Sequence, residues 1–311
     1  MRLPALLAIA LAVAVAAPLV PARAAPPSVV TDLPAIHSLT AQVAGELAAP
    51  VILLDRGADA HSFQLRPSQA RMLQEADLVI WSGPALAPWL ARALAGIATD
   101  VPQLALLEAP ETTLRATDRD NGHGHDREDD HEHDDDHAGA DLHAWLDPDN
   151  ARAWTQLIAE RLAALDPENA ASYRANAQDA RGRIAALEAE ISDILAPVGD
   201  AAIVVFHDAY GHFSGHFGVN VAASVALGDA ATPGAARLAR VRDVVERTGA
   251  ICVFPEAQHD PAYVELVVEG SGARIGAPLD PSGTTLDYGP ELYGDLLRGL
   301  AEGIAGCITG R

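Results

Sequence analysis

The chain has 311 residues, of which 49% are hydrophobic, which is enough for two lobes of ordinary domain size with a core in each. Its 21 basic and 43 acidic residues give a formal net charge of −22. This acidity argues against a nucleic-acid partner, because little positive charge is available to neutralise phosphates. The same negative charge favours the binding of cations.

Residues 1–24 have the pattern of a secretory signal peptide: Arg2, an apolar stretch from Leu3 to Val20, and a small-residue site at 22–24. We therefore expect cleavage before Ala25 and export of the mature protein. No cysteine stands directly after this segment, so we expect no lipid anchor there. No later apolar run has the length needed to cross a bilayer.

Apolar runs and helical patterns alternate through residues 28–107 and continue into a helix at 151–165. The repetition of strand, helix and strand predicts a parallel sheet covered by helices, which forms an N-terminal lobe over residues 25–165. The predicted strands are 28–32, 51–54, 78–83 and 101–107, and the predicted helices are 38–45, one beginning at Pro67, and 84–96.

Residues 118–137, DRDNGHGHDREDDHEHDDDH, contain five histidines, ten acids and no apolar residue. Such a segment has nothing to bury, so we expect a disordered loop over 118–139. Histidine mixed with carboxylate favours weak capture of a divalent transition metal over an inert linker. The histidines expected to take part are His123, His125, His131, His133 and His137.

A long helical pattern follows Pro167 and runs to about Leu195, and we expect residues 166–197 to link the two lobes. Residues 198–311 repeat the strand and helix alternation and form the predicted C-terminal lobe. Its predicted strands are 202–206, 219–224, 251–254 and 274–277, and its predicted helices are one from about His212, 233–248, one after Pro261, and 290–308.

Three histidines lie at the ends of such elements. His207 directly follows a short apolar strand, His61 lies in the turn-rich passage after the run 51–54, and His143 precedes a helical pattern. Imidazoles in these positions suggest one metal site, with three unrelated polar loop residues as the alternative. Asp280 lies just past the last predicted strand, where it is either a further ligand or the cap of a turn.

The remaining histidines of the two lobes are weaker candidates for metal ligands. His37 is a candidate for contact with the site, although a contact with solvent or backbone is favoured. His212 and His216 are four residues apart, the spacing of a paired zinc site, but a solvated helix face is favoured. His259, in the sequence PEAQHD, is interpreted as part of a polar loop and not as a second site.

Cys252 and Cys307 are the only cysteines of the chain. In an exported protein we expect them to form a disulfide. Thiolate metal ligands are the less favoured alternative, because neither cysteine has a partner at zinc-site spacing.

Five segments occur in an order that resembles a known family: HSFQLRPSQARMLQEADLVIWSGP, DLHAWLDPDNAR, FHDAYGHFSGHFG, CVFPEAQ and LDPSGT. Together with the His/Asp-rich interruption before His143, they resemble the metal-binding solute-receptor family, and in particular the ZnuA type of periplasmic zinc receptor of ABC importers. The resemblance implies two α/β lobes joined by one long helix, with the metal held in the cleft by residues matching His61, His143 and His207. It also implies a protein that is not an enzyme and acts as a monomer. The implied partners are an inner-membrane permease and, as a further candidate, a periplasmic zinc chaperone.

Many zinc members carry a glutamate directly before the first histidine, whereas this chain has Ala60. The fourth ligand is therefore open among Asp280, Asp59, a loop histidine and water. Three neutral imidazoles with one such ligand suit tetrahedral Zn²⁺, whereas Mn²⁺ prefers more oxygen. A zinc hydrolase or hydratase and a metal-storage protein or adhesin are the alternatives, since three histidines and water also form a catalytic arrangement.

Overall fold

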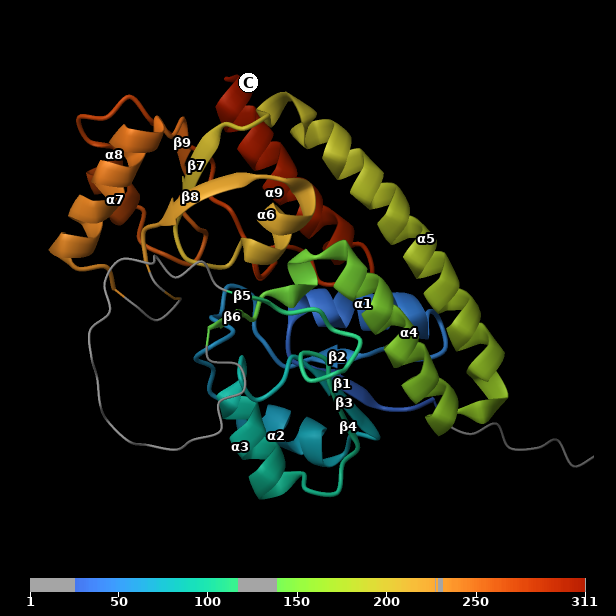
Figure 1. Ribbon diagram of the computed structural model, residues 1–311. Helices are drawn as coiled ribbons and strands as arrows, with labels where there is room; N and C mark the ends of the chain where they lie inside the picture. The colour runs from blue at the N-terminus through green and yellow to red at the C-terminus, as the bar shows by residue number, and fades with distance from the viewer. Residues whose placement is uncertain (1–25, 117–138, 227, 229–231, 311) are drawn as a thin grey trace, which may run out of the picture.

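The computed structural model describes residues 26–116, 139–226, 228 and 232–310 (Figure 1). The predicted signal peptide and the five loop histidines lie outside these residues. In the described part, two α/β halves lie one above the other, and the long helix α5 (Ala170–Leu195) runs along both (Figure 1). The predicted fold class is thus confirmed.

The first half is built on a four-stranded parallel sheet in the order β2-β1-β3-β4. Its central strands are fully buried, since each consists almost entirely of apolar residues that pack between helices on both faces. Each of its helices begins with proline in the first turn, where the missing N–H costs no hydrogen bond. The elements are β1 (Val29–Thr31), α1 (Pro34–Ala44), β2 (Val51–Ile52), α2 (Pro67–Gln74), β3 (Leu78–Trp81), α3 (Pro88–Ile97), β4 (Gln103–Ala105) and α4 (Pro148–Leu165).

The second half has a separate parallel sheet in the order β10-β9-β7-β8. A disulfide between Cys252 on β9 and Cys307 on the last helix ties this sheet to the helical layer. The elements are β7 (Ala202–Val205), α6 (Gly211–Phe217), β8 (Asn220–Ser224), α7 (Ala235–Thr248), β9 (Cys252–Val253), α8 (Ala262–Val268), β10 (Arg274–Ile275) and α9 (Leu292–Thr309).

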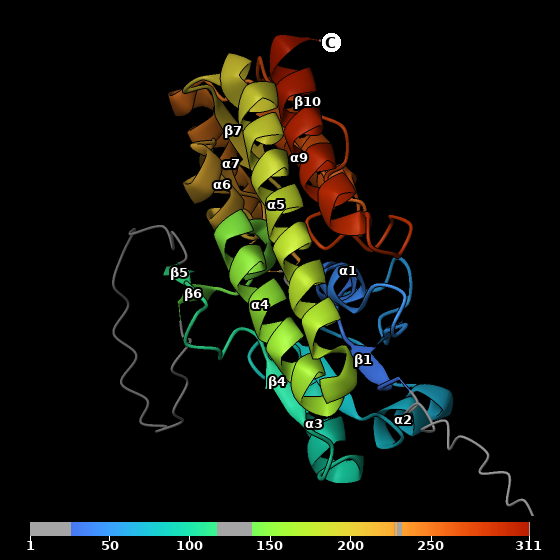
Figure 2. The same ribbon diagram turned by 90° about the vertical axis from the view of Figure 1, so that its right-hand side faces the viewer.

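Helix α5 connects the halves through a continuous apolar core. It packs against α1, α4 and α9, and Figure 2 shows α4 and α9 beside it. Ile184, Leu187 and Ile191 bury the stripe expected from their spacing. Short 3-10 turns at Pro167–Asn169 and Ala196–Val198 flank the helix, so the predicted linker 166–197 consists of three consecutive helical pieces.

A side-chain link also joins the halves near α1. Ser38 Oγ donates to the carbonyl of Pro290 at 2.8 Å and accepts the backbone N–H of Tyr293 at 3.0 Å. The two halves therefore share both apolar core and hydrogen bonds, which favours small loop rearrangements over wide hinge motion.

One pair of strands was not predicted. Strands β5 (Arg115–Ala116) and β6 (Ala140–Asp141) pair antiparallel on either side of the undescribed residues 117–138. Two-residue strands have no periodicity that a sequence pattern can reveal. Strand β6 leads directly into the 3-10 turn η1 (Ala144–Leu146), so it positions the residues around His143.

No helix in the described ranges is both long and apolar enough to cross a membrane.

Candidate metal centre

The three candidate histidines lie in segments that follow strands. His207 is the second residue after the buried strand β7 and is itself buried. His143 lies between β6 and η1. His61 lies in the turn-rich segment after β2, where its backbone N–H donates to Asp59 Oδ1 at 2.8 Å.

The three imidazoles meet in the folded chain. The Nε2 atoms of His143 and His207 are 3.4 Å apart, and their ring centroids are 5.2 Å apart. The ring centroid of His61 is 5.7 Å from that of His143. Two ligands of a tetrahedral zinc ion, at bond lengths of about 2.0–2.1 Å, are about 3.3–3.4 Å apart. The His143–His207 separation therefore matches one edge of such a tetrahedron.

Buried carboxylates orient both of these rings. Asp141 Oδ1 accepts hydrogen bonds from the backbone N–H and Nδ1 of His143, at 2.9 and 2.8 Å. Burial opposes ionisation of Asp141, but the hydrogen bonds and charge of His143 outweigh it and lower the pKa of this carboxyl to about 2. Glu256 Oε2 lies 2.5 Å from Nδ1 of His207, and Glu256 Oε1 accepts the Tyr210 hydroxyl at 2.9 Å.

This arrangement selects the ligand atom. A ring whose Nδ1 donates to a carboxylate presents Nε2 as its lone-pair nitrogen, and the carboxylate makes that nitrogen more basic. Sequence reasoning missed this role of both Asp141 and Glu256. The available signals were the aspartate two residues before His143 and the glutamate just past β9.

The two carboxylate candidates for a fourth ligand make local hydrogen bonds. Asp280 accepts from Gln258 Nε2 at 2.8 Å and from the backbone N–H and hydroxyl of Thr285 at 2.8 and 2.6 Å. These hydrogen bonds are those expected if Asp280 caps its turn. Asp59 likewise accepts from the N–H of His61 and the hydroxyl of Ser62. Ligation by either carboxylate stays a prediction.

The prediction of a solvated His212–His216 face is wrong. His212 has no exposed surface, and its ring Nε2 lies 3.0 Å from the carbonyl oxygen of Asp141. Helix α6 packs so closely on β6 that a Cβ atom at Gly211 would lie 2.7 Å from Asp141 Oδ2. Burial lowers the pKa of His212, against the opposing pull of Asp141. The spacing of four was correct for one face, but that face points inward.

His216 belongs to an ion-pair network and not to a pair with His212. Its Nδ1 lies 2.8 Å from Asp147 Oδ1, and its Nε2 lies 3.1 Å from Glu188 Oε1. The hydrogen bond to Asp147 raises the pKa of His216, with Glu188 adding to it. Asp147, Asp149 and His216 have metal-ligand spacing, but Arg115 and Arg152 already pair with these carboxylates and compete with a cation.

The contacts of His37 and His259 show the role of each of these two histidines. His37 Nε2 lies 3.2 Å from the carbonyl of Pro50, which agrees with the favoured backbone contact, and burial lowers its pKa. The ring of His259 stacks on Phe206 at a centroid distance of 4.3 Å, beside Glu256. His259 is thus closer to the centre than a solvated polar loop would place it.

The chain is a two-lobed α/β protein: each half has a parallel β-sheet, and helix α5 packs against both halves. The oriented imidazoles form a candidate metal centre between the halves. Residues 29–307 match the family described as ZnuA, zinc-uptake complex component A, periplasmic. The chain belongs to this family, and the resemblance seen in its motifs is confirmed.

Individual relatives and solved structures agree with this family assignment. The high-affinity zinc uptake system protein ZnuA of Paracoccus denitrificans (strain Pd 1222) is 48% identical over 96% of this chain and 97% of its own length. A solved crystal structure of ZnuA superposes with a TM-score of 0.74 at 22% identity, covering 90% of this chain and 98% of that one. The Mn²⁺ complex of the solute-binding protein FpvC of Pseudomonas aeruginosa gives a TM-score of 0.77 at 22% identity, covering 92% and 99%. These structures show the fold.

Proposed function

We propose that this protein captures zinc in the periplasm and delivers it to the permease of an ABC importer. The single observation that carries the proposal is the 3.4 Å separation of the His143 and His207 Nε2 atoms, each on a ring held at Nδ1 by a buried carboxylate. Membership of a periplasmic zinc-uptake family and 48% identity to a zinc uptake protein support the same function. The hydrolase and storage alternatives are not favoured, because the family consists of receptors.

The proposed ligands are the imidazoles of His61, His143 and His207. Zinc is the cargo, and three neutral nitrogens suit its tetrahedral preference. The fourth position is filled by Asp280, Asp59, a histidine of the loop or water. Asp280 would have to exchange hydrogen bonds with Gln258 and Thr285 for a bond to zinc, which links loading to a rearrangement of its turn.

The His/Asp-rich segment 118–137 is proposed to gather zinc and raise its local concentration near the centre, since many weak ligands exchange metal rapidly. Export by the segment 1–24, action as a monomer, and receipt of zinc from a periplasmic chaperone complete the proposal. Division of the mature chain at residues 165 and 198 also stays a prediction.

Alanine substitution tests the ligand set. The mature protein carrying His61→Ala, His143→Ala and His207→Ala together is titrated with zinc against a competing chelator. We expect one tight zinc per wild-type chain and none in the triple variant, while His37→Ala, which removes a buried imidazole held by a backbone carbonyl, retains it. Tight binding that survives the triple substitution would refute the proposal.

A further inference from the structure

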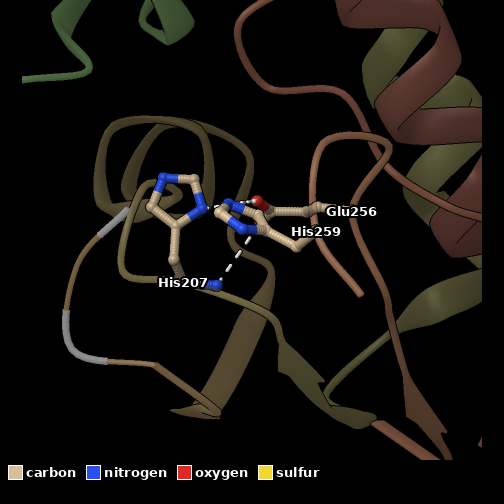
Figure 3. A group of neighbouring side chains, drawn as sticks. All are labelled: His207, Glu256 and His259. Carbon is tan, nitrogen blue, oxygen red and sulfur yellow. Dashed lines mark hydrogen bonds and ion pairs between the residues drawn. The ribbon is translucent and has the colours of Figure 1, made fainter. Parts of the chain in front are cut away.

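His259 lies next to the centre but is not one of the proposed ligands. Figure 3 shows it beside His207 and Glu256, and the ligand atoms of the three residues lie within 4.8 Å of one another. The side chain of His259 is 22% exposed, whereas those of Glu256 and His207 are 1% and 4% exposed. His259 therefore joins solvent to a carboxylate that is otherwise buried.

The ring of His259 is held in place by stacking. It lies 4.3 Å from the ring of Phe206, with an angle of 16° between the planes. Its Nε2 is 3.7 Å from Glu256 Oε2. This distance is too long for a hydrogen bond. It fits two ligands of one zinc ion that subtend an angle of about 125° at bond lengths of about 2.1 Å.

His207 is not a third ligand at this position. Its Nδ1 is only 2.5 Å from Glu256 Oε2, which is a hydrogen-bond distance and shorter than the separation of two ligands on one zinc ion. Of this group of described residues, His259 and Glu256 then remain as ligands, so the position binds weakly and exchanges its ion quickly.

An ion at this position would lie on the Glu256 side of His207, one imidazole ring away from the Nε2 pair. Two dications at such a short separation repel each other strongly in a buried environment. The two positions are therefore filled in turn and not together.

We propose that His259 Nε2 and Glu256 Oε2 form a transient outer position through which zinc enters and leaves the three-histidine centre. This inference rests on the proposed function, because it requires zinc to bind at that centre. A transient position changes the barrier in both directions, so its loss slows loading and release by the same factor and leaves the dissociation constant unchanged.

Two variants separate ligation from packing. His259→Phe keeps an aromatic ring on Phe206 but has no ligand atom, and His259→Ala removes both. Apoprotein is mixed with zinc alone in a stopped-flow instrument, and tryptophan fluorescence is followed, since Trp145 lies 5.1 Å from the His143 ring. Release is then measured by mixing the loaded protein with excess chelator.

We expect loading and release to slow together by roughly tenfold in both variants, which corresponds to about 1.4 kcal/mol of added barrier. The dissociation constant should stay within about twofold of the wild type, since both rates change by the same factor. Unchanged rates in His259→Phe would overturn the inference, as would a change in affinity without matched rates or two zinc ions held together. Failure of the wild type to bind zinc would instead overturn the proposed function.

Discussion

The orienting role of Asp141 gives a prediction that the structure quantifies. Asp141 Oδ1 accepts two hydrogen bonds from His143, and its Oδ2 accepts the backbone N–H of His212 at 3.2 Å. In Asp141→Asn only one of these oxygens stays an acceptor, so an amide N–H must face a donor on one side. If the His143 ring changes tautomer to relieve this contact, its Nε2 becomes protonated and cannot bind metal.

Loss of such a carboxylate costs about 10- to 100-fold in metal affinity. This corresponds to about 1.4 to 2.7 kcal/mol of binding free energy. The assay is a competition titration of zinc between the metal-free protein and a chelator of similar affinity. Asp149→Asn is the matched control, because it removes the same charge from an exposed side chain that pairs with Arg152. Equal zinc affinities for the two variants would refute the orienting role of Asp141.

Three further outcomes follow from the structure. Burial raises the pKa of Asp32 to about 6 from 3.8, although hydrogen bonds from Ser82 oppose the shift. The protonated carboxyl therefore stabilises the fold below about pH 4, and this contribution of about 3 kcal/mol is lost as the pH rises through 6. Urea unfolding of the metal-free protein at several pH values should show this loss in the wild type and not in Asp32→Asn; parallel pH profiles would contradict it. Replacing Cys252 and Cys307 by serine should lower the free energy of unfolding by about 4 kcal/mol, since their 55-residue separation closes a long loop, and an unchanged denaturation midpoint would contradict this. Deleting residues 118–137 should leave one tight zinc site but slow zinc acquisition from a chelator at low zinc, and equal transfer rates would reduce the segment to a spacer.

Most of the secondary structure could be predicted because the elements of the two α/β halves, unlike β5 and β6, carry a local signal. Several strands, such as 202–205, are apolar runs, and helices such as α4 begin with proline and bury one stripe. The parallel topology followed from the alternation of the two. Element lengths were less predictable: β2 and β9 have two residues each, because pairing with a neighbour and not composition ends a strand.

The site was predictable only in part. The positions of His61, His143 and His207 near predicted strands and helices suggested them as ligands, but the family resemblance was needed to group them, since spacing along the chain contains no information about convergence in space. Asp141 was missed because an aspartate near a histidine has the same sequence pattern whether its side chain points inward or into solvent. His212 was misassigned for the same reason: a spacing of four identifies one helix face but does not show which side of a seven-residue helix is buried.

Anomalous diffraction at the zinc edge, from crystals of the zinc-loaded mature protein, tests the central claim most directly. We expect one strong peak between the halves, at about 2.0–2.1 Å from imidazole nitrogens of His61, His143 and His207. A principal peak at Asp147, Asp149 and His216, or one beyond bonding distance of the three imidazoles, would contradict the proposed centre.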